Sequence, residues 1–314
     1  MTIGGYPIFR LGAGDVERVH SLMSLVPRQD GKTLQAASVT DDSNRHLISR
    51  SDAYKCWSRV VEIYSQTQLL YPSDKLIALS GIAKTISRQI DDTYIVGMWK
   101  KYPASQLLWR VDPVYENGQF SYLSKRSKDY RAPTFSWAAV EADRGIKYGE
   151  FTDQDLLIEV KEIEVTPERT EDEFGVVKKG YLKLSGVFKK IEMNVSTKDG
   201  VTCYGWHLVR YGIGAKLSIY KNVCLDSPKS DPDILGPDGQ VYCLPARKDS
   251  AGYLICLLLQ LEKKDNIETG NFRRIGVTKI PSHGGGQESV CQLWGDEPAM
   301  PYGNWDTEHT ICLV

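Results

Sequence analysis

Apolar residues recur at helical spacing in two segments between residues 51 and 90. In the first segment they are three and four residues apart, which places them on one face of a helix: Tyr54, Trp57, Val61 and Tyr64. Ser51 is the expected N-cap of this helix. A second helix is expected to begin at Ser73, directly after Pro72, with an apolar stripe at Leu76, Leu79, Ala83, Ile86 and Ile90. Two helices with a short connection predict a helical hairpin.

From about residue 137 the pattern changes to short runs rich in Val, Ile, Leu and Tyr, separated by Gly, Pro, Asp and Ser. Such runs predict β-strands, here at 156–165, 176–184, 187–193, 205–209, 217–223, 241–244, 253–261 and 272–280. Successive strands without an intervening helix favour an antiparallel arrangement. The predicted fold class is α+β and predominantly β, with the N-terminal helical hairpin packed on an antiparallel β-sandwich or distorted barrel.

These patterns divide the chain into four parts. Residues 1–50 are polar and predict an irregular lead-in, while 51–135 hold the helical hairpin and aromatic loops. Residues 136–281 form the predicted antiparallel β domain, in which 226–240 is expected to be a loop, and 282–314 an irregular tail. We expect 51–281 to form one compact unit.

Composition restricts the classes of binding partner and the cellular compartment that we expect. The net charge of the 314-residue chain is −1, so no global field would attract nucleic acid or an anionic membrane. No apolar run reaches transmembrane length, and the first residues lack the pattern of a secretory signal. The seven cysteines are scattered and form no CxxC pair, as is typical of free thiols in a reducing compartment. We therefore expect a cytoplasmic protein that binds neither nucleic acid nor membrane.

Large aromatic and turn residues between 57 and 137 are the most conspicuous feature of the sequence. A buried tryptophan removes on the order of 150–250 Å² from water, which suits a structural anchor. Glycine permits close packing or a positive φ, and proline fixes the approach to a strand. The predicted structural anchors are Trp57, Gly81, Trp99, Trp109, Pro133 and Trp137.

The same residues occur in ordered motifs, at Trp57, Tyr64-Ser65, 73–83, 94–99, 107–109 and 130–138, with weaker matches at 241–245 and 272–276. This series resembles the region C-terminal to the HET domain in fungal heterokaryon-incompatibility proteins. The resemblance covers roughly residues 51–280 of this chain. The HET domain itself is not recognisable in residues 1–50, and Phe135 stands where the family motif has a tryptophan.

The resemblance implies the companion region of that family, not the domain associated with triggering cell death. We therefore expect a non-catalytic module for partner binding or regulation in fungal self/non-self signalling. Its partner would be another protein.

The sequence indicates no cofactor and no metal site. Adjacent carboxylates at Asp91-Asp92 do not face the same way on a helix, and the five histidines lack zinc-binding spacing. The acidic residues of the 226–240 loop are expected to be solvated, at Asp226, Asp231, Asp233 and Asp238. Short basic pairs such as Arg273-Arg274 are interspersed with acids, as on solvated strand edges.

One strand offers an alternative function. Alternation places Tyr204 and Trp206 on one face of this strand, and Cys203, His207 and Tyr211 on the other. If the strand lined a cavity, a histidine flanked by tyrosines would suit general acid–base chemistry. The alternative is a cofactor-free cyclase or isomerase of fungal secondary metabolism that binds a small molecule in the β domain. Its catalytic candidates are His207, Tyr204, Trp206 and Tyr211, and the competing interpretation of His207 is a half-exposed sheet histidine.

Overall fold

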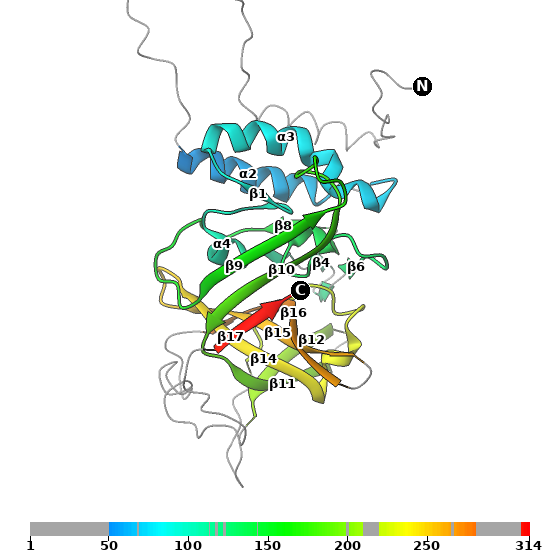
Figure 1. Cartoon of the computed structure of the whole chain (residues 1–314). Helices are drawn as coiled ribbons and strands as arrows, with labels where there is room; N and C mark the ends of the chain where they lie inside the picture. The colour runs from blue at the N-terminus through cyan, green and yellow to red at the C-terminus, as the bar shows by residue number, and fades with distance from the viewer. Residues whose placement is uncertain are drawn as a thin grey trace, which may run out of the picture.

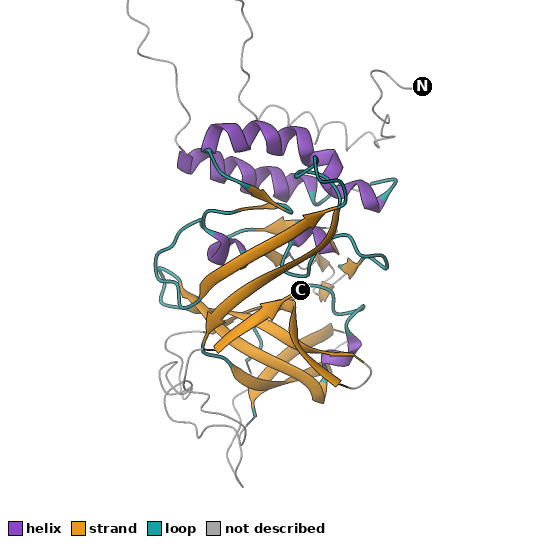
Figure 2. Cartoon of the chain, viewed as in Figure 1, coloured by secondary structure: helices purple, strands orange, loops and turns teal. Residues whose placement is uncertain are grey.

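The computed structural model describes residues 50–67, 69–112, 114–116, 119–121, 124–142, 144–198, 201–209, 220–264, 267–280 and 309–314. This part of the chain is mostly β, with a helical hairpin at one end of the molecule and a large sheet at the other (Figures 1 and 2). The predicted lead-in lies outside the described residues, except for Arg50. Within the described residues, no helix combines the length and the apolar character needed to cross a membrane.

The helical hairpin consists of α2 (Arg50–Tyr64) and α3 (Lys75–Ile90), connected through the 3-10 helix η1 (Pro72–Asp74). Every residue of the two predicted apolar faces is buried, which confirms the helical periodicity. Arg50 is already helical, so the prediction that Ser51 caps the helix is wrong. The second helix ends at Ile90 and is capped by Asp91, whose N–H bonds to the Ser87 carbonyl and whose left-handed conformation (φ 53°) turns the chain out of the helix.

Between the hairpin and the large sheet, the aromatic loops form short paired segments. Antiparallel pairs join β1 (Tyr94–Ile95) to β2 (Met98–Trp99), β3 (Arg110–Val111) to β8 (Ile146–Lys147), β4 (Val114–Glu116) to β5 (Gln119–Ser121), and β6 (Lys125–Arg126) to β7 (Val140–Glu141). The short helices α4 (Pro103–Gln106) and η2 (Trp137–Ala139) complete this layer.

The large sheet contains β9 (Glu159–Pro167), β10 (Val177–Gly186), β11 (Lys189–Lys198), β12 (Val201–Leu208), β13 (Val223–Leu225), β14 (Gly236–Lys248), β15 (Leu254–Lys264), β16 (Ile267–Ile280) and β17 (His309–Leu313). The strand order is β12-β11-β14-β15-β16-β17-β10-β9, and β13 pairs with β16. Hydrogen bonds join all nine strands into one sheet whose path ends at β12 and β9.

The sheet is mixed, because β17 pairs parallel with β16 and antiparallel with β10 (Figure 1, red strand). The expectation of a purely antiparallel sheet is therefore wrong. So is the expectation of an irregular tail at residues 309–313, since this strand connects two parts of the sheet. The predicted loop at 226–240 also needs correction, because it contains the 3-10 helix η3 (Pro232–Ile234) and the start of β14.

Two clusters of buried apolar side chains hold these layers together. The larger cluster runs without interruption from α2 and α3 through the aromatic loops to one face of the large sheet. The smaller one surrounds Trp206, whose ring stacks on Tyr220 at a centroid distance of 4.4 Å. The helical hairpin thus packs against the body of the protein through a continuous core.

Candidate functional site

Tryptophans connect the helical hairpin to the aromatic loops. Trp57 of α2, Trp99, Trp109 and Trp137 are all fully buried. The indole Nε1 atoms of Trp57 and Trp137 both donate to the carbonyl oxygen of Gly97, at 3.3 and 2.7 Å. Gly97 has φ 90°, and a Cβ at this position would lie 2.7 Å from Trp137 Nε1, so only glycine fits.

The two remaining predicted anchors behave differently. Pro133 is buried; its carbonyl accepts the N–H of Ser136 at 3.0 Å, and its ring lies close to Gly180 of β10. Gly81 is exposed on α3, and a Cβ added there would meet nothing within 4 Å. The expectation that Gly81 allows close packing is therefore wrong.

A buried ion pair connects the loops to the large sheet. Arg274 of β16 and Asp226 have fully buried side chains and approach to 2.5 Å between Nη1 and Oδ2. Burial raises the pKa of Asp226 and lowers that of Arg274 to about 10, because a low-dielectric interior opposes both charges. Trp109 Nε1 donates to the carbonyl of Phe135 at 2.9 Å, and the Trp109 carbonyl accepts from Arg274 Nη2.

This pair corrects two sequence-based expectations. Asp226 and Asp231 are buried, not solvated, and Arg274 is not on a wet strand edge. Asp231 binds both Arg126 of β6 and Arg273 of β16, each at 3.1 Å. The compensating arginines come from segments remote in the sequence, so local composition gave no sign of burial.

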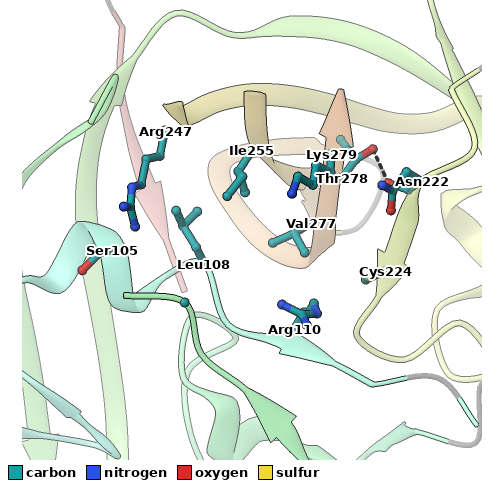
Figure 3. Close-up of a pocket in the computed structure, with 11 residues that line it drawn as sticks. Ser105, Leu108, Arg110, Asn222, Cys224, Arg247, Ile255, Val277, Thr278 and Lys279 are labelled. Atoms are coloured by element: carbon teal, nitrogen blue, oxygen red, sulfur yellow. Dashed lines mark hydrogen bonds between the residues drawn. The ribbon is translucent and has the colours of Figure 1, made fainter. Parts of the chain in front are cut away.

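A cavity of about 330 Å³ lies beside this ion pair, between the α4–β3 segment and strands β13 to β16. Its cationic wall consists of Arg110, Arg247 and Lys279, which Figure 3 shows around the apolar side chains of Leu108 and Val277. The other described lining residues are Ser105, Gly149, Asn222, Cys224, Ile255 and Thr278. This lining therefore carries three positive charges and no carboxylate.

Each of the three cations also has an acidic partner outside the cavity wall. Arg247 Nη2 contacts Glu150 Oε2 at 2.9 Å, and Lys279 Nζ contacts Asp249 Oδ2 at 2.6 Å. Arg110 Nε is 3.7 Å from Asp112 Oδ1, a loose ion pair. The side chain of Arg247 is only 10 % exposed, and its Nε is buried without a hydrogen-bond partner among the described residues. A buried donor of this kind favours an acceptor in the cavity.

The neutral polar groups of the cavity support its wall. Thr278 Oγ1 donates to the carbonyl of Asn222 at 2.8 Å, the contact dashed in Figure 3, and accepts from Trp206 Nε1 at 3.0 Å. Burial raises the pKa of the Cys224 thiol, which keeps it protonated and weakly nucleophilic. Among the described residues, no group of three metal-ligating side chains comes together.

The residues proposed for catalysis are not brought together at this cavity. The alternation predicted for β12 is confirmed, since Trp206 and Leu208 are buried while Cys203 is exposed. His207 is half-buried and lies 2.8 Å from Asn194 Nδ2 and 3.9 Å from Glu192 Oε2 of neighbouring β11. This is the sheet histidine of the competing interpretation.

The described residues that line this cavity do not include Tyr204, Trp206 or His207. Trp206 contacts the cavity wall from the core side, because its Nε1 donates to Thr278. Tyr211 lies outside the described residues.

Sequence reasoning missed the cavity because its cations come from distant segments. The sequence offered one indication of the site, since Arg110 directly follows the 107–109 motif. Arg247 and Lys279 lie in strands whose pairing partners the sequence does not reveal. Searches with this chain found no matching protein-family model, no matching curated protein and no matching solved structure.

Proposed function

We propose that this chain is a cytoplasmic binding module related to the companion region of HET proteins, which binds a small organic anion in the cavity. This proposal rests on one observation: the described residues of the cavity lining include three cationic side chains and no carboxylate. Bound anion would shift the contacts of α4 and β3, and a protein partner would recognise that state. Five cysteines among the described residues are free thiols, which suits a reducing compartment: Cys203, Cys224, Cys243, Cys256 and Cys312.

The chemistry of the wall indicates the class of ligand. Guanidinium groups bind carboxylates and phosphates through two parallel hydrogen bonds, and Arg110 and Arg247 both offer such groups. Leu108, Ile255 and Val277 supply an apolar surface for the body of the ligand. A volume of about 330 Å³ suits a metabolite-sized molecule. A carboxylic acid or phosphate ester with a compact apolar body fits these features.

The contacts made by the neutral polar groups of the cavity also support a binding role. Thr278 is engaged with Asn222 and Trp206, and the Cys224 thiol has a raised pKa. These groups maintain the wall and are not poised to attack a ligand. The alternative proposal, a cofactor-free cyclase or isomerase, predicts product formation as well as binding.

The test is a calorimetric screen of the full chain against small carboxylates and phosphate esters. Replacing Arg110 or Lys279 with methionine should weaken binding about tenfold or more, because hydrogen bonds to charged groups contribute roughly 1.5–3 kcal/mol. Added salt should weaken binding of the wild type as well.

Lys55→Met is the matched control, since Lys55 is 75 % exposed on α2 and pairs with Asp52 at 3.5 Å. Unchanged affinity in both cavity variants would refute the proposed site. Chromatography of each binding mixture separates the two proposals, because conversion of a bound compound would support the enzyme.

A further inference from the structure

A second cavity, of about 300 Å³, lies where the helical hairpin meets the aromatic loops. It is separate from the cavity proposed to bind the anion, and the described residues that line the two cavities do not overlap. The end of α2 and the start of α3 form one part of its wall, and residues 125–142 form another. Its chemistry comes from the buried basic side chains of Lys75 and Arg131 and from the carboxylate of Glu141.

Lys75 is held firmly in this wall. The residue is only 5 % exposed, its Nζ donates to the carbonyl of Val140, and Nζ lies 5.3 Å from the centre of the Trp137 ring. The hydroxyl of Tyr64 donates to the Lys75 carbonyl at 2.7 Å, which fixes the backbone at the start of α3. The amine therefore has a fixed position inside the protein.

Arg131 independently indicates a ligand. Its side chain is 5 % exposed, its Nε donates to the Ala138 carbonyl at 2.7 Å, and its Nη1 donates to the Pro72 carbonyl at 3.1 Å. Nη2 is buried and has no hydrogen-bond partner among the described residues. An unused guanidinium donor in a cavity wall suits a carboxylate oxygen.

The charges around Lys75 favour its neutral form. Burial and the positive charge of Arg131 together lower the pKa of Lys75 to about 7, although the Glu141 carboxylate acts in the opposite direction. Lys125 also lines the cavity and forms an ion pair with Glu141 at 3.2 Å. The negative charge of Glu141 is therefore shared between Lys125 and Lys75. Tyr64, the titratable group facing from α2, has a raised pKa and stays neutral. A substantial fraction of Lys75 is then an unprotonated amine near neutral pH.

We propose that Lys75 is a nucleophilic amine that captures an aldehyde acid or 2-oxo acid as an imine, with the carboxylate of the ligand bound by Arg131. The nitrogen lone pair attacks the carbonyl carbon, and one proton moves from the nitrogen to the carbonyl oxygen to give a carbinolamine. Loss of the hydroxyl group together with the second amine proton, as water, forms the C=N bond. No oxidant or reductant is required, and hydrolysis reverses the step.

The experiment traps the imine in the folded full chain. Glyoxylate and sodium cyanoborohydride are added at pH 7, and peptide mass spectrometry follows modification of each lysine with time. Lys84 is the internal control, because it is exposed on the same helix. We expect Lys75 to be modified at least ten times faster than Lys84, since an ordinary lysine with a pKa near 10.4 is almost entirely protonated at pH 7. Equal rates would overturn the proposal.

The role of Arg131 is tested by comparing glyoxylate with acetaldehyde, which lacks the carboxylate. Lys75 of the wild type should favour glyoxylate by about tenfold or more, and Arg131→Lys should reduce this preference while near-ultraviolet circular dichroism confirms the native fold. Equal rates with the two aldehydes in the wild type would overturn the assignment of Arg131. Lys55→Met serves as a control at an exposed position of α2 and should leave the Lys75 rate unchanged.

Discussion

The guanidinium carbon of Arg274 lies 3.4 Å from the centre of the Trp109 ring, and both side chains are fully buried. Through this contact the 107–109 motif is joined to strand β16, although the two segments are 165 residues apart in sequence. The stacked pair also lies beside the anion cavity, since Arg274 and Asp226 both influence the pKa of Cys224 in its wall. The relationship therefore links the core of the protein to its proposed binding site.

Replacing Arg274 with methionine should destabilise the protein by about 3–5 kcal/mol, because it removes the close partner of the buried Asp226 carboxylate and leaves only Arg126, 3.7 Å away. Urea unfolding followed by tryptophan fluorescence measures this loss. The double variant Arg274→Met, Asp226→Leu removes both charges and should recover part of the stability. A double variant less stable than the single one would contradict the account.

Gly81→Ala and Gly97→Ala should change stability in opposite directions. Gly81 is mid-helix with open space around it, so alanine should stabilise α3 by about 0.5–1 kcal/mol. Gly97 has a positive φ and packs against Trp137, so alanine should destabilise the protein by at least about 1 kcal/mol. Thermal unfolding of both variants tests the pair, and a stabilised Gly97→Ala protein would be inconsistent with the structure.

The lowered pKa of Lys75 predicts a specific dependence of stability on pH. Between about pH 7 and 10.5 the unfolded chain binds more protons at Lys75 than the native protein does, so native stability should rise with pH. Relative to Lys75→Met, the wild type should gain roughly 1.4 kcal/mol per pH unit in this window. Below pH 7 the difference should level off, because both states are then protonated.

Denaturant unfolding of wild type and Lys75→Met at several pH values measures this slope. Parallel curves across the window would show that Lys75 titrates normally. Lys84→Met, at an exposed position of the same helix, is the control and should follow the wild type.

Cys224 should resist alkylation although it lines a cavity. Burial raises the pKa of its thiol, which lowers the fraction of reactive thiolate, whereas Cys203 is exposed. Iodoacetamide at pH 8 with peptide mass spectrometry should label Cys203 at least ten times faster. Preferential labelling of Cys224 would indicate an activated thiol and would favour the enzymatic alternative.

The sequence by itself determined the helical hairpin, the buried tryptophans and most strands of the large sheet. Each of these follows from a local period: Leu76, Leu79 and Ala83 fall on one face of α3 whatever packs against them. For Gly97, which lies in the 94–99 motif, a need for either close packing or a positive φ was predictable, and the structure has both. The exposed position of Gly81 was not, because a helix interior gives no local sign of which face a glycine occupies.

Only the tertiary structure decided the strand order, the place of β17, and the surroundings of the charged residues. Arg274, Asp226, Lys75 and Arg131 have the same local pattern as solvated residues, and their burial depends on partners that lie far away in the chain. The cavity cations Arg110, Arg247 and Lys279 meet because tertiary packing places β3 against the large sheet that contains β14 and β16. The hydrophobic period of a helix or strand indicates which of its faces is buried. A buried charge, in contrast, is stabilised by specific groups from distant parts of the chain, and only the tertiary packing determines which groups these are.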